Sequence, residues 1–427
     1  MTTSSNPDVT RGRARRSRAR LRAVGAAVCG LALVGGAAYA ASLPEPSERR
    51  TGNALAQDIE ARSSGQQVLG GTREPGTPSI QRLRHDNVVF TVTIAPARPG
   101  PNLVRVDAAT VGSGGHREHR GKVYVGTQTD DDAGRMTLAR PRAGADGLWA
   151  VIDLPAGTAS VLVTHGSQHR VPFAVETGSA EPRDLSAWVG ADGPECVTTA
   201  TAILLAGGPP ATSCPASALS EPDRSALESV VDTLTTRGVE EIAVRTDESA
   251  RSQAAYDVVR RAAMSSGVRV VSPEDPPGRR NALLVVSGWQ DAAESLAANT
   301  AQPLREQAIR SDGTWLAPWL LSPGVVDSTA GAMVALDFDI RDDRAQEFSQ
   351  ALATYLPGQA PTSSAYVAWR SQRGDDPSPT TLYAASRAAY LPSQPGHAGH
   401  ETEVAWFPGG TVTPVGTVPS SRTTSHP

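Results

Sequence analysis

Apolar and polar positions follow two different periods along the chain, and each period defines a region. Between residues 80 and 178, short runs of alternating apolar and polar side chains are separated by turn-forming Pro and Gly clusters. Such alternation is typical of strands that bury one face. The runs cover residues 88–94, 102–108, 122–126, 135–139, 148–154, 159–165 and 171–176. They predict an antiparallel β-sandwich with Trp149 in its core.

Residues 183–393 instead combine near-continuous apolar runs with segments of helical period. The apolar runs cover 240–246, 268–272, 281–288, 315–322 and 332–339, and helices are expected at 218–237, 250–266 and 290–299. Strands that are apolar on both faces belong to sheets covered by helices on both sides. The alternation of strands and helices therefore predicts an α/β domain with a mainly parallel sheet.

The first 41 residues have the layout of an export signal or a signal anchor. Seven Arg precede an apolar run over residues 23–41, which is just long enough to span a bilayer. The Arg residues favour a cytoplasmic N-terminus, whereas Ala38 and Ala40 also fit a cleavage site. We expect the rest of the chain outside the membrane, either anchored by a single N-terminal helix or secreted after cleavage.

Two polar segments rich in Pro, Gly, Ser and Thr are expected to be flexible, a linker over residues 42–79 and a tail over residues 394–427. The sequence therefore predicts a multidomain protein. Its parts are residues 1–41, 42–79, 80–178, 183–393 and 394–427.

Charge and cysteine content narrow the classes of partner. The net charge of −4 combines +6 in residues 1–22 with about −10 in the remainder, which argues against a nucleic-acid partner. Of the 3 cysteines, Cys196 and Cys214 lie in the exported part and are predicted to form a disulfide in that oxidising compartment. The alternative, a metal site with two thiolates, would need further His or Cys ligands nearby.

The first patterned region resembles the immunoglobulin-like extracytoplasmic domain of copper-resistance and YtkA-like bacterial proteins. The resemblance rests on residues 90–94, 99–106 and 147–149, and it implies an immunoglobulin-like β-sandwich. It also implies copper as a metal that the domain could bind, and copper prefers soft or imidazole ligands. The candidate metal ligands are His116 and His119 in the loop GGHREHR, and the alternative is two solvated surface histidines.

The second patterned region resembles type 1 periplasmic substrate-binding proteins of the kind that serve amino-acid transporters. The matching order of strands, loops and helices covers residues 242–271, 281–297, 323–339 and 344–369. The family's opening strand and glycine-rich ligand loop have no counterpart in LSAWVGADGPEC or before it. The resemblance implies capture of a small polar metabolite, such as an amino acid, and its delivery to a membrane partner.

Polar residues gather where two of the expected strands end, at the edge where open α/β sheets bind ligands. They are Asp247, Ser249, Arg251 and Ser252 after one strand, and Ser287 and Trp289 after another. Hydroxyl and amide groups at a helix start, together with Arg251, can hold a carboxylate, and Trp289 can cover an apolar group. In the alternative, the polar residues cap helices and loops, and Trp289 packs between lobes.

Motifs of common enzymes are absent from the sequence, namely the P-loop, G-x-G-x-x-G, H-E-x-x-H and C-x-x-C. Ser287 also lacks the G-x-S-x-G setting of a nucleophile elbow, because residue 285 is Val. We therefore predict a non-enzymatic protein with no cofactor. The leading hypothesis is an exported, membrane-anchored binding protein of actinobacterial type that recognises a small polar metabolite. The alternatives are a cell-surface interaction or structural protein, docked to a membrane or surface partner, and copper handling through the histidine loops.

Overall fold

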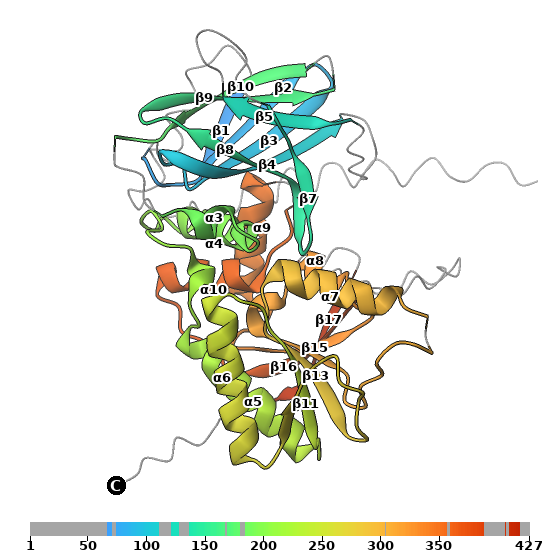
Figure 1. Ribbon diagram of the computed structural model, residues 1–427. Helices are drawn as coiled ribbons and strands as arrows, with labels where there is room; N and C mark the ends of the chain where they lie inside the picture. The colour runs from blue at the N-terminus through green and yellow to red at the C-terminus, as the bar shows by residue number, and fades with distance from the viewer. Residues whose placement is uncertain are drawn as a thin grey trace, which may run out of the picture. The chain divides into compact units, whose positions relative to one another are not determined.

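The computed structural model in Figure 1 describes residues 66–70, 74–110, 121–127, 136–166, 169–179, 184–303, 305–356, 359–387, 406 and 410–418. The predicted signal or anchor segment, residues 1–41, and the loop that holds His116 and His119 lie outside the described residues. Among the helices that the structure does describe, none is both long enough and apolar enough to cross a bilayer. The described residues belong to one compact unit, which runs from Thr51 to Pro427.

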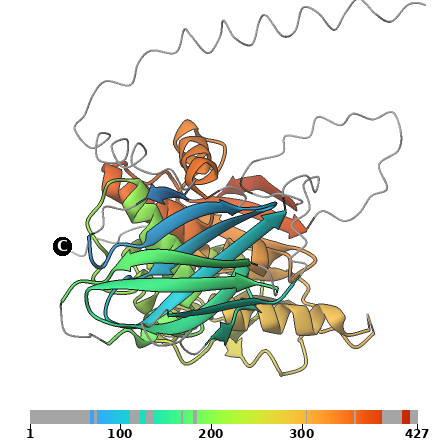
Figure 2. The ribbon, with the colours of Figure 1, turned by 90° about the horizontal axis from the view of Figure 1, so that it is seen from above.

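The described residues between 66 and 179 form two antiparallel sheets (Figure 2). The larger sheet has the strand order β1-β2-β3-β4-β8-β7, with bounds Gln66–Gly70, Ser79–His85, Val88–Ala95, Gly100–Thr110, Ala145–Leu154 and Arg140–Arg142. The smaller sheet has the order β10-β9-β5-β6, with bounds His169–Glu176, Thr158–His165, Val123–Thr127 and Thr137–Leu138. Each of the seven runs predicted from the alternating pattern overlaps one of these strands.

The two sheets share a core in which Phe90 and Phe173 are fully buried. Leu148 of β8 faces this core, and the next residue along the strand faces the opposite way. That residue is Trp149, so the prediction that it lies in the sandwich core is wrong. Trp149 is buried on the other face of the larger sheet, in a cluster with Trp188.

A seven-stranded mixed sheet lies at the centre of the remaining chain. Its order is β12-β11-β13-β14-β15-β16-β17, with bounds Arg269–Val271, Glu241–Arg245, Asn281–Val285, Thr314–Leu316, Ala332–Leu336, Thr381–Arg387 and Gly410–Thr417. The strands β11 to β15 pair in parallel, and β16 and β17 join them antiparallel. The predicted α/β class is confirmed, whereas the antiparallel strands at one end of the sheet were not predicted.

Most helices pack with this sheet in one hydrophobic core. They are α5 (Glu221–Thr236), α6 (Ala250–Ser265), α7 (Trp289–Ala301), α8 (Pro323–Val326), α9 (Asp343–Tyr355) and α10 (Ser363–Arg373). Ser220 caps α5 by accepting a hydrogen bond from the Asp223 N–H, as its position in the sequence predicts. The 3₁₀ turns η1 (Pro215–Ser217) and η2 (Pro318–Leu320) complete this part.

Helix α4 (Gly193–Leu205) connects the two regions and was not predicted. It follows the short helix α3 (Ser186–Val189) and is buried over most of its length. Near its start, Cys196 and Val197 pack with Trp149 of the sandwich, whereas Ala202 belongs to the core of the α/β region. A helix that is covered all round has no polar face, so its sequence carries no amphipathic period by which to recognise it.

Two segments that were predicted to be flexible contain strands at sheet edges. β1 lies within residues 42–79 and pairs with β2, and β17 lies within residues 394–427 and pairs with β16. An edge strand pairs on one side only, so polar side chains and Pro do not exclude it. Pro414 of β17 occupies such a position.

Candidate functional site

Asp247, Ser249 and Ser252 lie together at the carboxyl end of β11, where they tie the loop to the start of α6. Ser249 is the N-cap of α6 and accepts a hydrogen bond from the Ser252 N–H at 3.2 Å. The Ser252 hydroxyl accepts from the Asp247 N–H at 2.9 Å. The Asp247 carboxylate accepts from the N–H groups of Ser249 and Gly288 at 2.8 and 2.7 Å. These are the contacts of the capping alternative, because each polar group has a partner within the chain.

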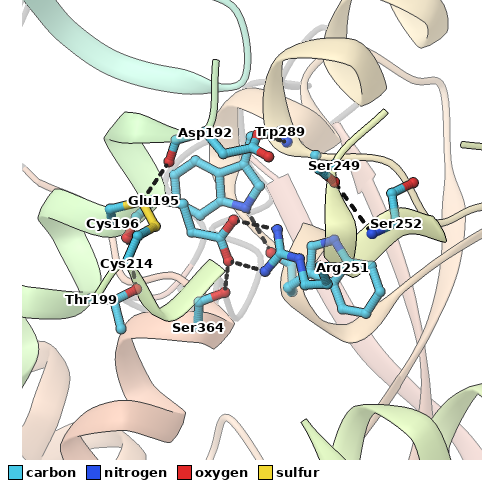
Figure 3. A network of polar contacts seen from close by, with 12 residues as sticks. Asp192, Glu195, Cys196, Thr199, Cys214, Ser249, Arg251, Ser252, Trp289 and Ser364 are labelled. Carbon is cyan, nitrogen blue, oxygen red and sulfur yellow. Dashed lines mark hydrogen bonds and ion pairs between the residues drawn. A yellow bond between two sulfur atoms is a disulfide. The ribbon is translucent and has the colours of Figure 1, made fainter. Parts of the chain in front are cut away.

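Arg251 is 4% exposed and forms a bidentate ion pair with Glu195 of α4 (Figure 3). Its Nη1 and Nη2 donate to the two Glu195 carboxylate oxygens at 2.8 and 2.7 Å. The Ser364 hydroxyl donates to the same carboxylate at 2.5 Å, and the ring centre of Trp319 lies 4.6 Å from the guanidinium carbon. Glu195 thus occupies the place at which a ligand carboxylate would pair with Arg251.

Sequence reasoning missed Glu195 because the helix that carries it was not recognised. A usable signal was present, since Glu195 is the only charged residue in the segment GPECVTTATAILL. A charge in an otherwise apolar helix needs a partner when it is buried. The only cations that could serve it are arginines elsewhere in the chain or Lys122, and the sequence does not indicate which of them it meets.

The N-terminus of α7 is also occupied by carboxylates of the chain itself, of which Figure 3 shows Asp192 beside Trp289. The Trp289 N–H donates to Asp192 at 2.9 Å, next to the bond from the Gly288 N–H to Asp247. A helix N-terminus favours anions, so these two carboxylates satisfy the donors that a ligand would use. The approach is close enough to require glycine, because a Cβ at Gly288 would come within 2.1 Å of the Asp192 carboxylate.

Trp289 is buried and packs where the β-sandwich meets the α/β region. Its Nε1–H donates to the Trp319 carbonyl at 2.8 Å, and the Trp319 Nε1–H donates to the Ser287 carbonyl at 3.0 Å. Gly144, in the turn before β8, lies against the Trp289 backbone, where a Cβ would come within 2.5 Å of the carbonyl oxygen. Ser322 donates to the Gly144 carbonyl at 3.3 Å. The sandwich therefore covers this edge of the mixed sheet.

Little space is left at this edge. The cavity that adjoins Trp289, Trp149 and Gln359 has a volume of about 20 Å³, which is room for about one water molecule. Ser287 is 1% exposed, and its hydroxyl has no hydrogen-bond partner among the described residues. The predicted binding residues are therefore brought together, but they form a closed network in place of an open site.

A disulfide joins Cys196 to Cys214, as predicted, with the two Cα atoms 5.1 Å apart. It links the start of α4 to the residue before η1. Because Cys196 follows Glu195 in the chain, the bond holds α4 beside the ion pair with Arg251.

The carboxyl group of Asp192 has an unusual environment in this network. Burial, the charge of Glu195 and that of Asp247 raise its pKa to about 6, although Arg251 and the Trp289 N–H act in the opposite direction. For Asp247, hydrogen bonds from Ser249 and Gly288 outweigh the effect of burial, and its pKa is lowered. Of the two carboxyl groups at the start of α7, Asp192 thus has a raised pKa and Asp247 has a lowered pKa.

We expect Asp192→Asn to stabilise the fold at pH 7.5 by about 2–3 kcal/mol, because the folded state then no longer holds this carboxylate in its unfavourable ionised form. The folded pKa of Asp192, about 6, exceeds the unfolded value. Between these two values the folded state binds more protons, so its contribution to the free energy of unfolding falls as pH rises. Urea unfolding from pH 4 to 8 measures this slope, which Asp192→Asn should reduce. Asp232→Asn, at an exposed position, serves as the control. Equal slopes in the wild-type protein and both variants would contradict a raised pKa for Asp192.

The candidate metal ligands His116 and His119 lie outside the described residues. Among the residues that are described, no group of three or more His, Cys, Asp or Glu side chains is arranged to hold a metal ion. Copper handling through the histidine loop stays a prediction.

A wider groove lies along α7, and sequence reasoning missed it. It has a volume of about 520 Å³ and is open to solvent. Its lining includes Leu283 and Val285 of β13, Ser295, Leu296, Ala298, Asn299 and Thr300 of α7, and Gln307, Ala308, Ile309 and Arg310 of the segment that follows. We call this the α7 groove. No sequence motif marks it, because its walls come from a strand, a helix and an irregular segment that only the fold brings together.

The sequence matches no protein-family model and no curated protein. Solved structures similar to part of the chain include solute-binding proteins of the class that the α/β region was predicted to resemble. One is an ABC transporter solute-binding protein from R. palustris in complex with benzoate, with 11% identity over 46% of this chain and 63% of that chain and a TM-score of 0.30. Another is a branched-chain amino acid ABC transporter periplasmic ligand-binding protein from Burkholderia xenovorans, with 11% identity, coverage of 54% and 79%, and a TM-score of 0.31.

A third is an ABC transporter substrate-binding protein from Desulfitobacterium hafniense in complex with Leu, with 13% identity, coverage of 35% and 47%, and a TM-score of 0.26. For three of the similar structures, the chain spans only 49–63% of the solved chain's length. At these TM-scores the likeness carries no argument about ligand or mechanism. The function therefore has to be inferred from the geometry of the chain itself.

Proposed function

We propose that the chain is an exported, non-enzymatic binding protein whose α/β region takes a small molecule in the α7 groove. The observation that carries the proposal is the difference in volume between the two places that could receive a ligand. The α7 groove has about 520 Å³, within the range of about 300–1,000 Å³ that small-molecule sites occupy. The predicted site at the carboxyl edge adjoins about 20 Å³ and is filled by Glu195 and Asp192.

The non-enzymatic part of the proposal is supported by the state of Ser287. Its hydroxyl is buried, and within the described part of the chain no base accepts a hydrogen bond from it. A nucleophilic serine needs such a base and access to substrate. Export and anchoring rest on residues 1–41 of the sequence, whose Arg-rich start precedes an apolar run.

We also propose that the β-sandwich is immunoglobulin-like, and its strand order supports this. The succession β3-β4-β8-β7 matches the A-B-E-D sheet of an immunoglobulin fold, and β5-β9-β10 matches its C-F-G sheet. In this assignment β1 and β2 extend the first sheet, and the cluster around Trp149 shows that the same sheet is covered by α3 and α4. The domain thus serves as a support for the α/β region.

The test is thermal unfolding of the full chain in detergent, screened against amino acids, short carboxylic acids, sugars and small peptides. A compound at about 100 times its Kd should raise the free energy of unfolding by about 2.7 kcal/mol. We expect Ala298→Trp to weaken the response, because the indole would occupy part of the α7 groove. Ala297→Trp is the matched control, since Ala297 is the exposed neighbour on the same helix and does not line the groove.

Two results would contradict the proposal. One is a screen in which no compound stabilises the wild-type protein. The other is a ligand whose effect is the same in both Trp variants, which would place its site elsewhere. If substitution of Arg251 abolished the effect of such a ligand, the ligand would bind at the carboxyl ends of β11 and β13. That site would then have to open in solution.

A second candidate function, a cell-surface interaction or structural protein without a small ligand, is favoured by the closure of the sheet edge. The sandwich and α4 share buried residues around Trp149 and Cys196, so a partner could contact both. Chemical cross-linking of the full chain in its native membrane distinguishes this role. A specific cross-linked partner combined with a flat ligand screen would support it over small-molecule binding.

A further inference from the structure

We infer that the α7 groove recognises a small molecule that carries a carboxylate on an apolar body, with Arg310 as the residue that binds the carboxylate. The inference rests on the proposed function, because it names the chemical class of ligand for the same groove. Arg310 lines the groove on the segment that follows α7. Three observations support this assignment. They are the unmet hydrogen bonds of Arg310, its lack of an ion pair with a described residue, and the apolar side chains that line the groove.

The guanidinium of Arg310 is incompletely satisfied. Its Nη2 donates to the Pro273 carbonyl at 2.8 Å. The Nε and Nη1 atoms are buried and have no hydrogen-bond partner among the described residues. Leaving donors of a cation buried and unpaired is costly. Nε and Nη1 lie on different edges of the guanidinium, and each shares its edge with Nη2, so a carboxylate can pair with either edge. A carboxylate seated in the groove would form this pair after a rotation of the side chain.

Among the charged residues that line the groove, Arg310 is the cation that has no ion pair with a described residue. The other arginine of the groove, Arg245, donates to Glu274 at 3.0 Å and lies 3.9 Å from Asp291. Arg310 forms no ion pair with a described residue, and burial lowers its pKa although the charges of Glu241, Asp275 and Glu274 act in the opposite direction. An anionic ligand could form the ion pair that Arg310 lacks, whereas a cationic ligand would be repelled by its guanidinium.

Apolar side chains form part of the groove lining. Leu283, Val285 and Leu296 belong to this lining, as does Ile309, which is 75% exposed. The Gln307 side chain donates to the Thr300 and Gln302 carbonyls at 3.3 and 2.8 Å, which ties the Arg310 segment to the end of α7. Such a site can hold a hydrocarbon body against the apolar side chains while the carboxylate faces Arg310.

The test uses hexanoate, hexanamide and hexylammonium as probes of one shape and three charges, with inorganic phosphate as a fourth. Their affinities for the full chain in detergent are measured by calorimetry. We expect hexanoate to bind about tenfold more tightly than hexanamide, because its carboxylate gains a charge-assisted hydrogen-bond pair with Arg310. Arg310→Gln should remove this preference, and Arg310→Lys should keep part of it. Arg305→Gln is the matched control, since Arg305 lies on the same segment, is 84% exposed and pairs only with Glu306 among the described residues.

Equal affinity for hexanoate and hexanamide in the wild-type protein would overturn the inference, and this comparison does not depend on any variant folding. If both then lost affinity on Ala298→Trp, the proposed function would stand and only the charge preference would fail. Tighter binding of phosphate than of hexanoate would also overturn it, because the apolar lining would then contribute nothing. Absence of binding by all four probes would overturn it as well, whereas a hit from the wider screen would keep the proposed function.

Discussion

Glu195→Ala is expected to lower the free energy of unfolding by about 3–5 kcal/mol, because it leaves the Arg251 guanidinium buried without its carboxylate partner. Arg251 and Glu195 are 4% and 1% exposed, so water cannot replace the lost contact without opening the structure. Urea unfolding at pH 7.5, followed by tryptophan fluorescence, measures the change. Glu294→Ala, on the exposed side of α7, is the control and should change stability by less than about 0.5 kcal/mol.

Two further variants show whether charge pairing or packing is responsible. Replacing both Glu195 and Arg251 with Met should restore much of the stability lost in Glu195→Ala, since an apolar pair carries no uncompensated charge. Formate or acetate should also partly restore Glu195→Ala by occupying the vacated carboxylate position beside Arg251 and Ser364. A loss below about 1 kcal/mol in Glu195→Ala would mean that the pair is not buried together in solution.

Removal of the disulfide is expected to have the next largest effect, a loss of about 3 kcal/mol in Cys196→Ser/Cys214→Ser. The two cysteines are 18 residues apart in sequence, so the reduced unfolded chain gains the entropy of a loop of that size. The measurement compares urea unfolding of the wild-type protein with and without a thiol-free reductant. The reduced wild-type protein should match the double variant, and the double variant should be insensitive to reductant. Equal stability of the oxidised and reduced wild-type protein would contradict the expectation.

Both changes act on the start of α4, and this bears on function. As long as Glu195 and the disulfide hold α4 in place, Arg251 and the start of α7 have carboxylate partners from the chain itself. A ligand that used the carboxyl edge would have to displace an intramolecular partner at high effective concentration. The α7 groove requires no such displacement, which is why we place small-molecule binding there.

Much of the fold could be predicted because it depends on local patterns. Alternation of period two located seven of the ten strands described in the sandwich sheets, all except β1, β2 and β7, and apolar runs between helical segments located β11 to β15. The caps at Ser220 and Ser249 follow from the residue types that satisfy the free N–H groups of a helix start. The cysteine pair followed from the predicted compartment. Edge strands and the fully buried α4 left no such pattern and were missed.

The sequence by itself determined most of the strands and helices, because those preferences arise between residues only a few positions apart. It also placed the polar residues at the ends of β11 and β13. Only the tertiary structure decided what these residues do, since Arg251 meets Glu195 from 56 positions away. The same holds for Trp149, which faces α3 and α4, and for the α7 groove. Contacts between distant elements depend on how those elements pack together, and a local pattern carries no record of the partner.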